Sequence, residues 1–263
     1  MNLTRSFRPP AGFFLPIALV LSCCGESALG VNAEGTEPLV LKLPAPALKG
    51  TPEDLPVGPN IEPYSDNRPP PFLVPKGVKN LAAGQLVTCS DLPTSGKLSQ
   101  ITDGKKEAFD YDRVEMKKGL QWVQVDLGEP KLVYAIVMWH DHRFTQTMHD
   151  VIVQVSNDPD FRKGATTLFN NDKDDSSGLG VGGDREYFET KFGRIVDGKG
   201  IKARYVRGYS NGNNLSLFNC WQEIEVYGLP ASPESGVATL SSTNSVAKGT
   251  EPLLLQLPSP ALR

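Results

Sequence analysis

Two consecutive apolar runs dominate the pattern of hydrophobic and polar positions along the chain. Residues 121–128 (QWVQVDLG) alternate, with two valines and Leu127 on one side, and a period of two predicts a half-buried β-strand. A turn signal, Gly-Glu-Pro, follows at residues 128–130. Residues 132–139 are then apolar on both faces and end in the polar residues 140–143 (HDHR). We interpret this second run as a central strand that carries a binding site at its tip.

Shorter strands are expected on both sides of these runs, and no segment has a helical period of useful length. Turn signals separate the strands, as at Asp103-Gly104 and in residues 157–159. The pattern predicts an all-β sandwich or barrel. The further strands are expected at residues 85–90, 150–156, 185–190, 203–209 and 223–227.

Proline is unevenly distributed and marks the boundaries of one globular domain. The 22 prolines are dense before about Pro75 and again after Leu229. We therefore expect a domain at residues 77–228, between proline-rich linkers at 34–76 and 229–263. The net charge of -3 offers no basic face for a nucleic-acid partner. A small neutral or polar ligand is compatible with it.

Residues 1–33 are expected to be a signal peptide, so the domain is predicted to be exported. Arg5 and Arg8 precede an apolar run at 13–21 that is too short to span a bilayer. Two processing schemes remain open. Cleavage after Ala33 would release a secreted or periplasmic protein, whereas residues 21–24 (LSCC) match a bacterial lipobox and would give a lipid anchor as the link to a membrane. An uncleaved anchor is a third alternative.

A repeat flanks the domain. Copy 1 is residues 35–49 (GTEPLVLKLPAPALK), and copy 2 is residues 249–263 (GTEPLLLQLPSPALR). The Pro-x-Pro core excludes a helix interior, whereas the alternating leucines are compatible with a short strand. One interpretation is a docking peptide that adds a strand to a protein partner. The other, which we favour, is a spacer left by duplication of a linker-plus-domain unit. Copy 2 lacks the Gly-Thr-Pro that follows copy 1, which is consistent with truncation there.

Two cysteines remain after the predicted signal peptide, Cys89 and Cys220, near the two ends of the predicted domain. In an oxidising compartment they are candidates for a disulfide. Such a bridge would close a long loop and contribute about 4–5 kcal/mol in the chain-entropy model. The alternative is two free, buried thiols.

Six short motifs occur in an order that resembles the coagulation factor 5/8 type C, or discoidin, family, which includes galactose-binding-like modules of bacterial glycosidases. The resemblance covers about residues 78–228. One such motif is weak, but six in order at suitable spacing are specific. They are NLA with VTCS (80–90), TDG (102–104), WVQVDLG (122–128), VQVSND (153–158), ARYVR (203–207) and EIEVYG (223–228).

The resemblance implies a jelly-roll sandwich with adjacent chain ends, whose loops at one end bind glycans, lipids or proteins without catalysis. It also implies a structural calcium ion at Asp103 and Glu223, because calcium prefers hard oxygen ligands. One departure stands against the ion. Residues 105–107 (KKE) follow Asp103-Gly104, where the sugar-binding members have asparagine and a nearby threonine.

The candidate ligand-binding residues lie at the tip of the second run and before the last strand. His140, His142 and Arg143 could bond to hydroxyls or a carboxylate, and Phe144 could stack on a sugar ring. By the resemblance, Phe218 supplies a second aromatic, and we include its neighbour Asn219. Two alternatives remain, a solvated strand end and a zinc site that adds His149 or Asp141.

No other segment carries convincing chemistry. The acidic loop at 170–178 fails as an EF-hand, and a solvated loop is the simpler interpretation. We find no arrangement of a nucleophile and a general base in the sequence that would support catalysis. We therefore expect an exported, non-catalytic module that binds a glycan. The alternative is a cell-surface assembly protein whose repeats dock a protein partner.

Overall fold

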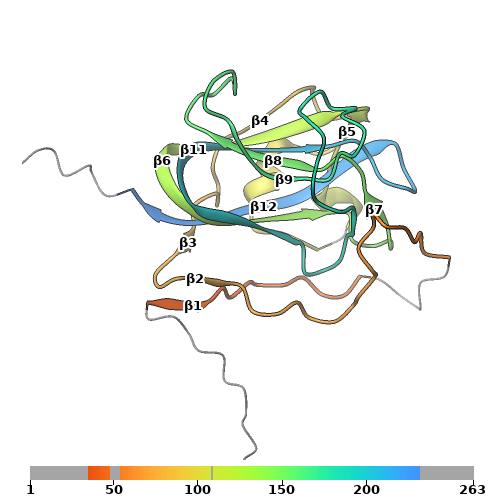
Figure 1. Ribbon diagram of the computed structural model, residues 1–263, viewed down its shortest axis with the longest axis horizontal. Helices are drawn as coiled ribbons and strands as arrows, with labels where there is room; N and C mark the ends of the chain where they lie inside the picture. Colours follow the sequence, from red (N-terminus) through yellow and green to blue (C-terminus); the bar gives the residue numbers. More distant parts are fainter. Residues whose placement is uncertain (1–34, 48–53, 108, 232–263) are drawn as a thin grey trace, which may run out of the picture.

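A computed structural model describes residues 35–47, 54–107 and 109–231 of the chain (Figure 1). The predicted signal peptide, its lipobox and copy 2 of the repeat lie outside these residues. Among the described residues, no helix is long and apolar enough to span a membrane. The helical segments described are two short 3-10 turns, η1 (Leu98–Thr102) and η2 (Asp110–Asp112).

One bent, antiparallel sheet forms both layers of the domain, which confirms the predicted all-β sandwich. Its main path runs in the order β3-β12-β6-β11-β8-β9, with β4 added to β6 and β5 added to β12. A separate pair, β7 (Thr147–Met148) and β10 (Tyr187–Phe188), closes one side. The strands of the main sheet are β3 (Lys79–Asn80), β4 (Val87–Cys89), β5 (Val114–Lys118), β6 (Gln121–His140), β8 (Ile152–Ser156), β9 (Thr166–Asn170), β11 (Arg194–Ser210) and β12 (Phe218–Pro230).

The two apolar runs that the sequence separates are one strand, β6, of 20 residues. The expected break at residues 128–130 is a bend instead. Gly128 adopts a positive φ of 81° there, which glycine tolerates, and its N–H donates to Asp126 Oδ1 at 2.8 Å. Before the bend β6 pairs with β4 and the end of β11, and after it with β12 and the start of β11. The same strand therefore contributes to both layers.

The core lies between these layers and is built mainly from branched aliphatic side chains of β6, β8, β11 and β12. Both faces of β6 after the bend are buried, as its apolar run predicts. Trp139 and Trp221 are fully buried, so both rings pack in the interior and neither is exposed to a ligand.

The predicted Cys89–Cys220 disulfide was wrong, since both thiols are free in the structure. Cys89 on β4 pairs opposite Val123 of β6, whereas Cys220 on β12 pairs opposite Glu115 of β5. The two cysteines thus belong to strands that do not neighbour each other in the sheet. Burial raises the pKa of the Cys220 thiol to about 11, so this side chain is a neutral thiol at physiological pH.

The segment expected to be a linker, 34–76, is partly built into the fold. β1 (Thr36–Pro38) pairs antiparallel with β2 (Leu73–Pro75), and both lie beneath the sandwich in Figure 1. Further along, Ile61 bridges to Glu186. Arg194 of β11 forms two hydrogen bonds with the Glu62 carboxylate, at 2.8 and 2.9 Å. Extended, proline-rich chain is therefore packed against the domain rather than spaced away from it.

Candidate functional site

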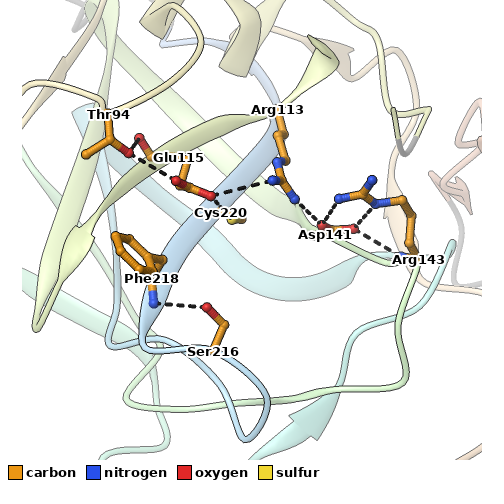
Figure 2. Close-up of polar contacts among 8 residues, drawn as sticks. All are labelled: Thr94, Arg113, Glu115, Asp141, Arg143, Ser216, Phe218 and Cys220. Atoms are coloured by element: carbon orange, nitrogen blue, oxygen red, sulfur yellow. Dashed lines mark hydrogen bonds and ion pairs between the residues drawn. The ribbon is translucent and has the colours of Figure 1, made fainter. Parts of the chain in front are cut away.

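The candidate site is a pair of arginines held by one carboxylate at the end of β6 (Figure 2). Asp141 follows the last residue of β6 and is almost fully buried. Its Oδ1 accepts from Arg143 Nε at 2.9 Å, and its Oδ2 accepts from Arg143 Nη2 at 2.6 Å and from Arg113 Nη1 at 2.8 Å. The side chains of Arg113 and Arg143 are 23% and 21% exposed. Asp141 thus fixes two partly exposed arginines side by side.

Arg113 comes from a different part of the chain and completes the pair. It follows η2 and directly precedes β5, and its Nη2 lies 3.5 Å from Glu115 Oε2. Thr94 Oγ1 in turn donates to Glu115 Oε1 at 3.2 Å. Figure 2 shows this line of polar contacts running from Thr94 through Glu115 and Arg113 to Asp141. Each arginine is therefore oriented by at least one carboxylate.

Burial and hydrogen bonding act in opposite directions on the pKa of Asp141. Desolvation raises the pKa of this carboxyl, but the hydrogen bonds and charge of Arg143, together with Arg113, outweigh it and leave the pKa below its usual value. Asp141 is therefore ionised at neutral pH. The Asp141 charge offsets one of the two arginine charges.

An exposed aromatic ring lies beside Arg143. Phe144 has 52% of its surface exposed, and the Arg143 guanidinium carbon is 5.4 Å from its ring centroid. A planar donor group next to an exposed ring can bond to hydroxyls or a carboxylate while the ring packs against the apolar face of the same ligand. This combination is the structure's clearest recognition chemistry at the end of β6.

Phe218, the second predicted aromatic, begins β12 and lies on the opposite side of Cys220 from Asp141 (Figure 2). Its ring is partly buried, with Lys118 Nζ 5.2 Å from the centroid. Its backbone N–H donates to Ser216 Oγ at 3.2 Å. Asn219, predicted with it, is fully buried and donates to the carbonyls of Lys117 and Gly119. Asn219 therefore supports the preceding loop and does not face solvent.

The expected exposure of His140 and His142 is corrected by the structure, since both side chains are buried. His140 Nδ1 lies 2.9 Å from Glu189 Oε2, a carboxylate that is also fully buried. His142 Nε2 lies 2.8 Å from the Lys106 carbonyl oxygen. The end of β6 is buried here: β12 pairs alongside it, and the His140 ring packs against the Trp221 ring. These histidines stand behind the arginine pair rather than on its rim.

The residues at the predicted calcium site do not fit the ion. Asp103 turns back on its own loop, where Oδ1 accepts from Lys105 N at 2.9 Å and Oδ2 lies 3.8 Å from Lys105 Nζ. Both carboxylate oxygens of buried Glu223 lie 3.1 Å from Gly104 N. Burial raises the pKa of Glu223 to about 9, so with no metal ion beside it this group is protonated at neutral pH.

Lys106 supplies a positive charge at the same turn. Its side chain is 3% exposed, and Nζ lies 2.6 Å from Glu225 Oε1 and 4.9 Å from the Trp139 ring centroid. A buried ammonium group paired with a strand carboxylate provides the charge that a metal ion would otherwise bring. The two lysines after Asp103-Gly104, noted in the sequence, are thus the reason for the misfit.

Three carboxylates converge elsewhere in the described chain, at Asp150, Asp172 and Asp174. The loop that holds two of them is less solvated than expected, because Asp172 is buried. Asp172 Oδ1 and Oδ2 accept backbone N–H groups from Asp174, Ser176 and Ser177. These bonds show that the Asp172 carboxylate holds the backbone of its own loop in place.

Comparison with known proteins is informative only for solved structures, because no protein-family model and no curated protein matches the sequence. The chain is similar to chitosan-binding module 1 of a chitosanase/glucanase from Paenibacillus sp. IK-5, at 22% identity over 57% of this chain and 99% of that chain, with a TM-score of 0.42. It is similar to a fucose-binding module of Streptococcus pneumoniae (17% identity, 57% and 97% covered, TM-score 0.42). It is also similar to the CBM32 of AlyQ in complex with 4,5-unsaturated mannuronic acid (18%, 54% and 92%, 0.41).

Proposed function

We propose that this chain is an exported, non-catalytic module that binds glycans through Arg113, Arg143 and Phe144. The observation that carries the proposal is the Asp141 carboxylate, which holds both guanidinium groups, with the exposed Phe144 ring beside Arg143. Because the donors are already oriented, little side-chain entropy is lost when a ligand binds. The ordered motifs that resemble the discoidin family support the same class of function.

The ligand that suits this site is a sugar with an acidic group or vicinal hydroxyls. Guanidinium N–H groups bond well to such oxygens, and the Asp141 and Glu115 carboxylates hold the two arginines in place. Phe144 would pack against the ring of the sugar. His140, His142 and Asn219, which are buried, would position this surface rather than touch the ligand.

A glycan-array screen of the full chain, followed by titration of the best ligand, tests the proposal. We expect Arg143→Ala to weaken binding about tenfold or more, since a charge-assisted hydrogen bond contributes about 1.5–3 kcal/mol. Phe144→Ala should also weaken binding, because the ring packing against the sugar is lost. Leu215→Ala is the matched control, because Leu215 is an equally exposed apolar residue on the loop before β12. Absence of any glycan ligand, or binding that both variants retain in full, would refute the proposal.

The alternative function, assembly through the repeats, stays a prediction. One observation bears on it. Copy 1 makes a strand pair with β2 of its own chain, so the repeat sequence is able to act as an added strand.

A further inference from the structure

Copy 1 of the repeat is a docking strand for the edge of β2. Its first residues form β1, in which Thr36 lies opposite Pro75 and Pro38 opposite Leu73. Just beyond the strand, Leu39 N donates to the Phe72 carbonyl at 2.7 Å. Glu37 Oε1 accepts from Gly77 N at 3.1 Å. β1 and β2 form a two-stranded sheet of their own, so among the described residues copy 1 supplies the strand with which β2 pairs.

The apolar side chains of copy 1 line a groove against the sandwich, with a volume of about 470 Å³. Copy 1 contributes three alternate leucines to this lining, together with Pro38 and the largely exposed Val40. The lining also includes the Pro69–Phe72 segment, Phe192 and Ile195. The leucines concerned are Leu39, Leu41 and Leu43, and all three are partly buried. Copy 1 thus docks by backbone pairing at one end and by apolar packing along the rest.

Copy 2 preserves the face of copy 1 that packs. Four of the fifteen paired positions differ between the copies, and in copy 1 these are Val40, Lys42, Ala45 and Lys49. The first three are exposed, Val40 to 82%, and Lys49 lies outside the described residues. Every described position of copy 1 that is buried or partly buried is identical in copy 2. These pairs are Thr36/Thr250, Leu39/Leu253, Leu41/Leu255, Leu43/Leu257, Pro44/Pro258 and Ala47/Ala261.

The match between identity and burial has a physical meaning. A spacer places no demand on which of its alternating side chains are retained, whereas a docking strand must keep the side chains that enter the groove. The Gly-Thr-Glu-Pro sequence that forms β1 and bonds to Gly77 N is also identical in copy 2. Copy 2 therefore carries the full set of groups that hold copy 1 in place.

The sequence contains two such strands, and among the described residues β2 is the partner of copy 1. We propose that copy 2 of one molecule docks on the β2 edge of a second copy of this chain, in the place of that molecule's copy 1. β1 has three residues, and so short an edge strand exchanges readily. Residues 231–248 tether copy 2 to its own domain, and eighteen residues span up to about 60 Å, enough to reach a neighbouring molecule. The inference does not depend on glycan binding.

The first test measures whether the groove accepts copy 2. The receptor is the full chain with Leu39→Asp, Leu41→Asp, Leu253→Asp and Leu255→Asp, which disables both of its own copies. A fluorescent peptide of residues 249–263 is titrated and its anisotropy followed. We expect saturable binding, at least tenfold tighter than that of a peptide carrying Leu253→Asp and Leu255→Asp.

A matched control peptide carries Leu254→Val, Gln256→Lys and Ser259→Ala, the residues that copy 1 has at its exposed positions. We expect this peptide to bind within about twofold of the native one, because the changes leave the packing face intact. Circular dichroism of the receptor confirms that it is folded. Equal binding of the native and aspartate peptides, or no binding to the folded receptor, would overturn the proposal.

The second test leaves copy 1 intact and identifies the partner. Chains whose one cysteine is Leu73→Cys are mixed with chains whose one cysteine is Pro252→Cys and oxidised, with Cys23, Cys24, Cys89 and Cys220 replaced by serine in both. This pair reproduces the Pro38–Leu73 register. We expect a disulfide-linked heterodimer at least fivefold more abundant than with Leu254→Cys, whose counterpart Val40 is exposed. A third chain carries both Leu73→Cys and Pro252→Cys. If a link forms within this chain but not between the two chains with one substitution each, docking between molecules is overturned.

Discussion

Asp141 is the residue on which the geometry of the candidate site depends. Its carboxylate contacts Arg113 and Arg143 at once, across 28 residues of sequence. Asn at this position would retain the shape and one acceptor oxygen but lose the charge that orients both guanidinium groups. The site is therefore sensitive to the ionisation of a single buried group.

The pH dependence of this residue follows from its lowered pKa. A carboxyl whose pKa is lower in the folded than in the unfolded chain stabilises the fold above the unfolded value, about 3.9. That contribution is lost as the pH falls through the folded pKa. We expect the stability difference between the native chain and Asp141→Asn to be constant from pH 5 to 8 and to shrink below pH 4. Urea unfolding at pH 3–8 measures it, and a difference that grows on acidification would contradict the assignment.

Lys106 illustrates what the sequence could and could not show at this scale. In the sequence, the two lysines after Asp103-Gly104 count against a calcium ion. In the structure, one of them, Lys106, forms a buried ion pair with Glu225 at this turn. The burial of His140 and His142 was not predictable, because polar residues at the end of a strand give the same sequence pattern whether they are exposed or buried. Arg113 was missed because its partner Asp141 is close only in the folded chain.

Replacing Lys106 tests its role as an internal cation. Lys106→Met leaves the buried Glu225 carboxylate without its ammonium partner, so we expect the free energy of unfolding to fall by about 3–5 kcal/mol. Adding Glu225→Gln should recover most of this loss, because both charges are then removed. Thermal melts with and without millimolar calcium provide the measurement. Rescue of Lys106→Met by calcium, abolished by Asp103→Asn, would show instead that a metal site lies at this turn.

At the scale of elements, the period-two runs predicted the main strands but not their continuity. β6 continues through Gly128-Glu129-Pro130 because residues 127–130 have no partner in β11 at the bend. Pro130 therefore breaks no hydrogen bond there. β5 was missed because its sequence, VEMKK, has only two apolar positions, both of which the structure buries. The alternation of apolar and polar residues identifies a strand well only when the strand has several apolar side chains on its buried face.

The entry into β11 depends on a close contact that only glycine allows. Gly193 precedes Arg194 with a φ of 68°, and a Cβ atom there would lie 2.6 Å from the Trp139 ring and 2.8 Å from the Met138 carbonyl oxygen. We expect Gly193→Ala to lower the free energy of unfolding by about 1–3 kcal/mol, as overpacking and positive φ both oppose it. Gly183→Ala is the control, since an added Cβ meets nothing within 4 Å. Equal melting temperatures for the two variants would rule out the contact.

At the scale of the whole molecule, the folded unit is larger than the composition of the chain indicated. Proline density predicted a domain boundary near residue 77. A proline-rich segment can, however, pack against a domain as well as serve as a linker. Tyr64 contacts Phe188 edge to face with centroids 5.5 Å apart, and Glu62 pairs with Arg194 of β11. The amino-acid composition of a segment indicates how stiff the segment is when it packs against nothing. It does not indicate which residues its side chains contact in the folded protein.

Removing the packed segment measures its contribution. We expect a chain that begins at Gly77 to melt several degrees below one that begins at Gly35, because Phe188, Phe192 and Ile195 lose apolar cover. Glu62→Gln in the longer chain should produce a smaller part of the same loss. Identical melting temperatures for the two chains would mean that residues 35–76 are a linker after all.

The passage of β6 through both layers governs how the domain comes apart. β6 pairs with β4 and β11 before the bend and with β11 and β12 after it, so neither layer can detach without pulling on the strand that builds the other. Partial opening of one layer then gains little chain entropy for the bonds it breaks. Native-state hydrogen exchange should therefore show the amides of β6 before and after Gly128 exchanging at a common, slow rate that tracks global unfolding.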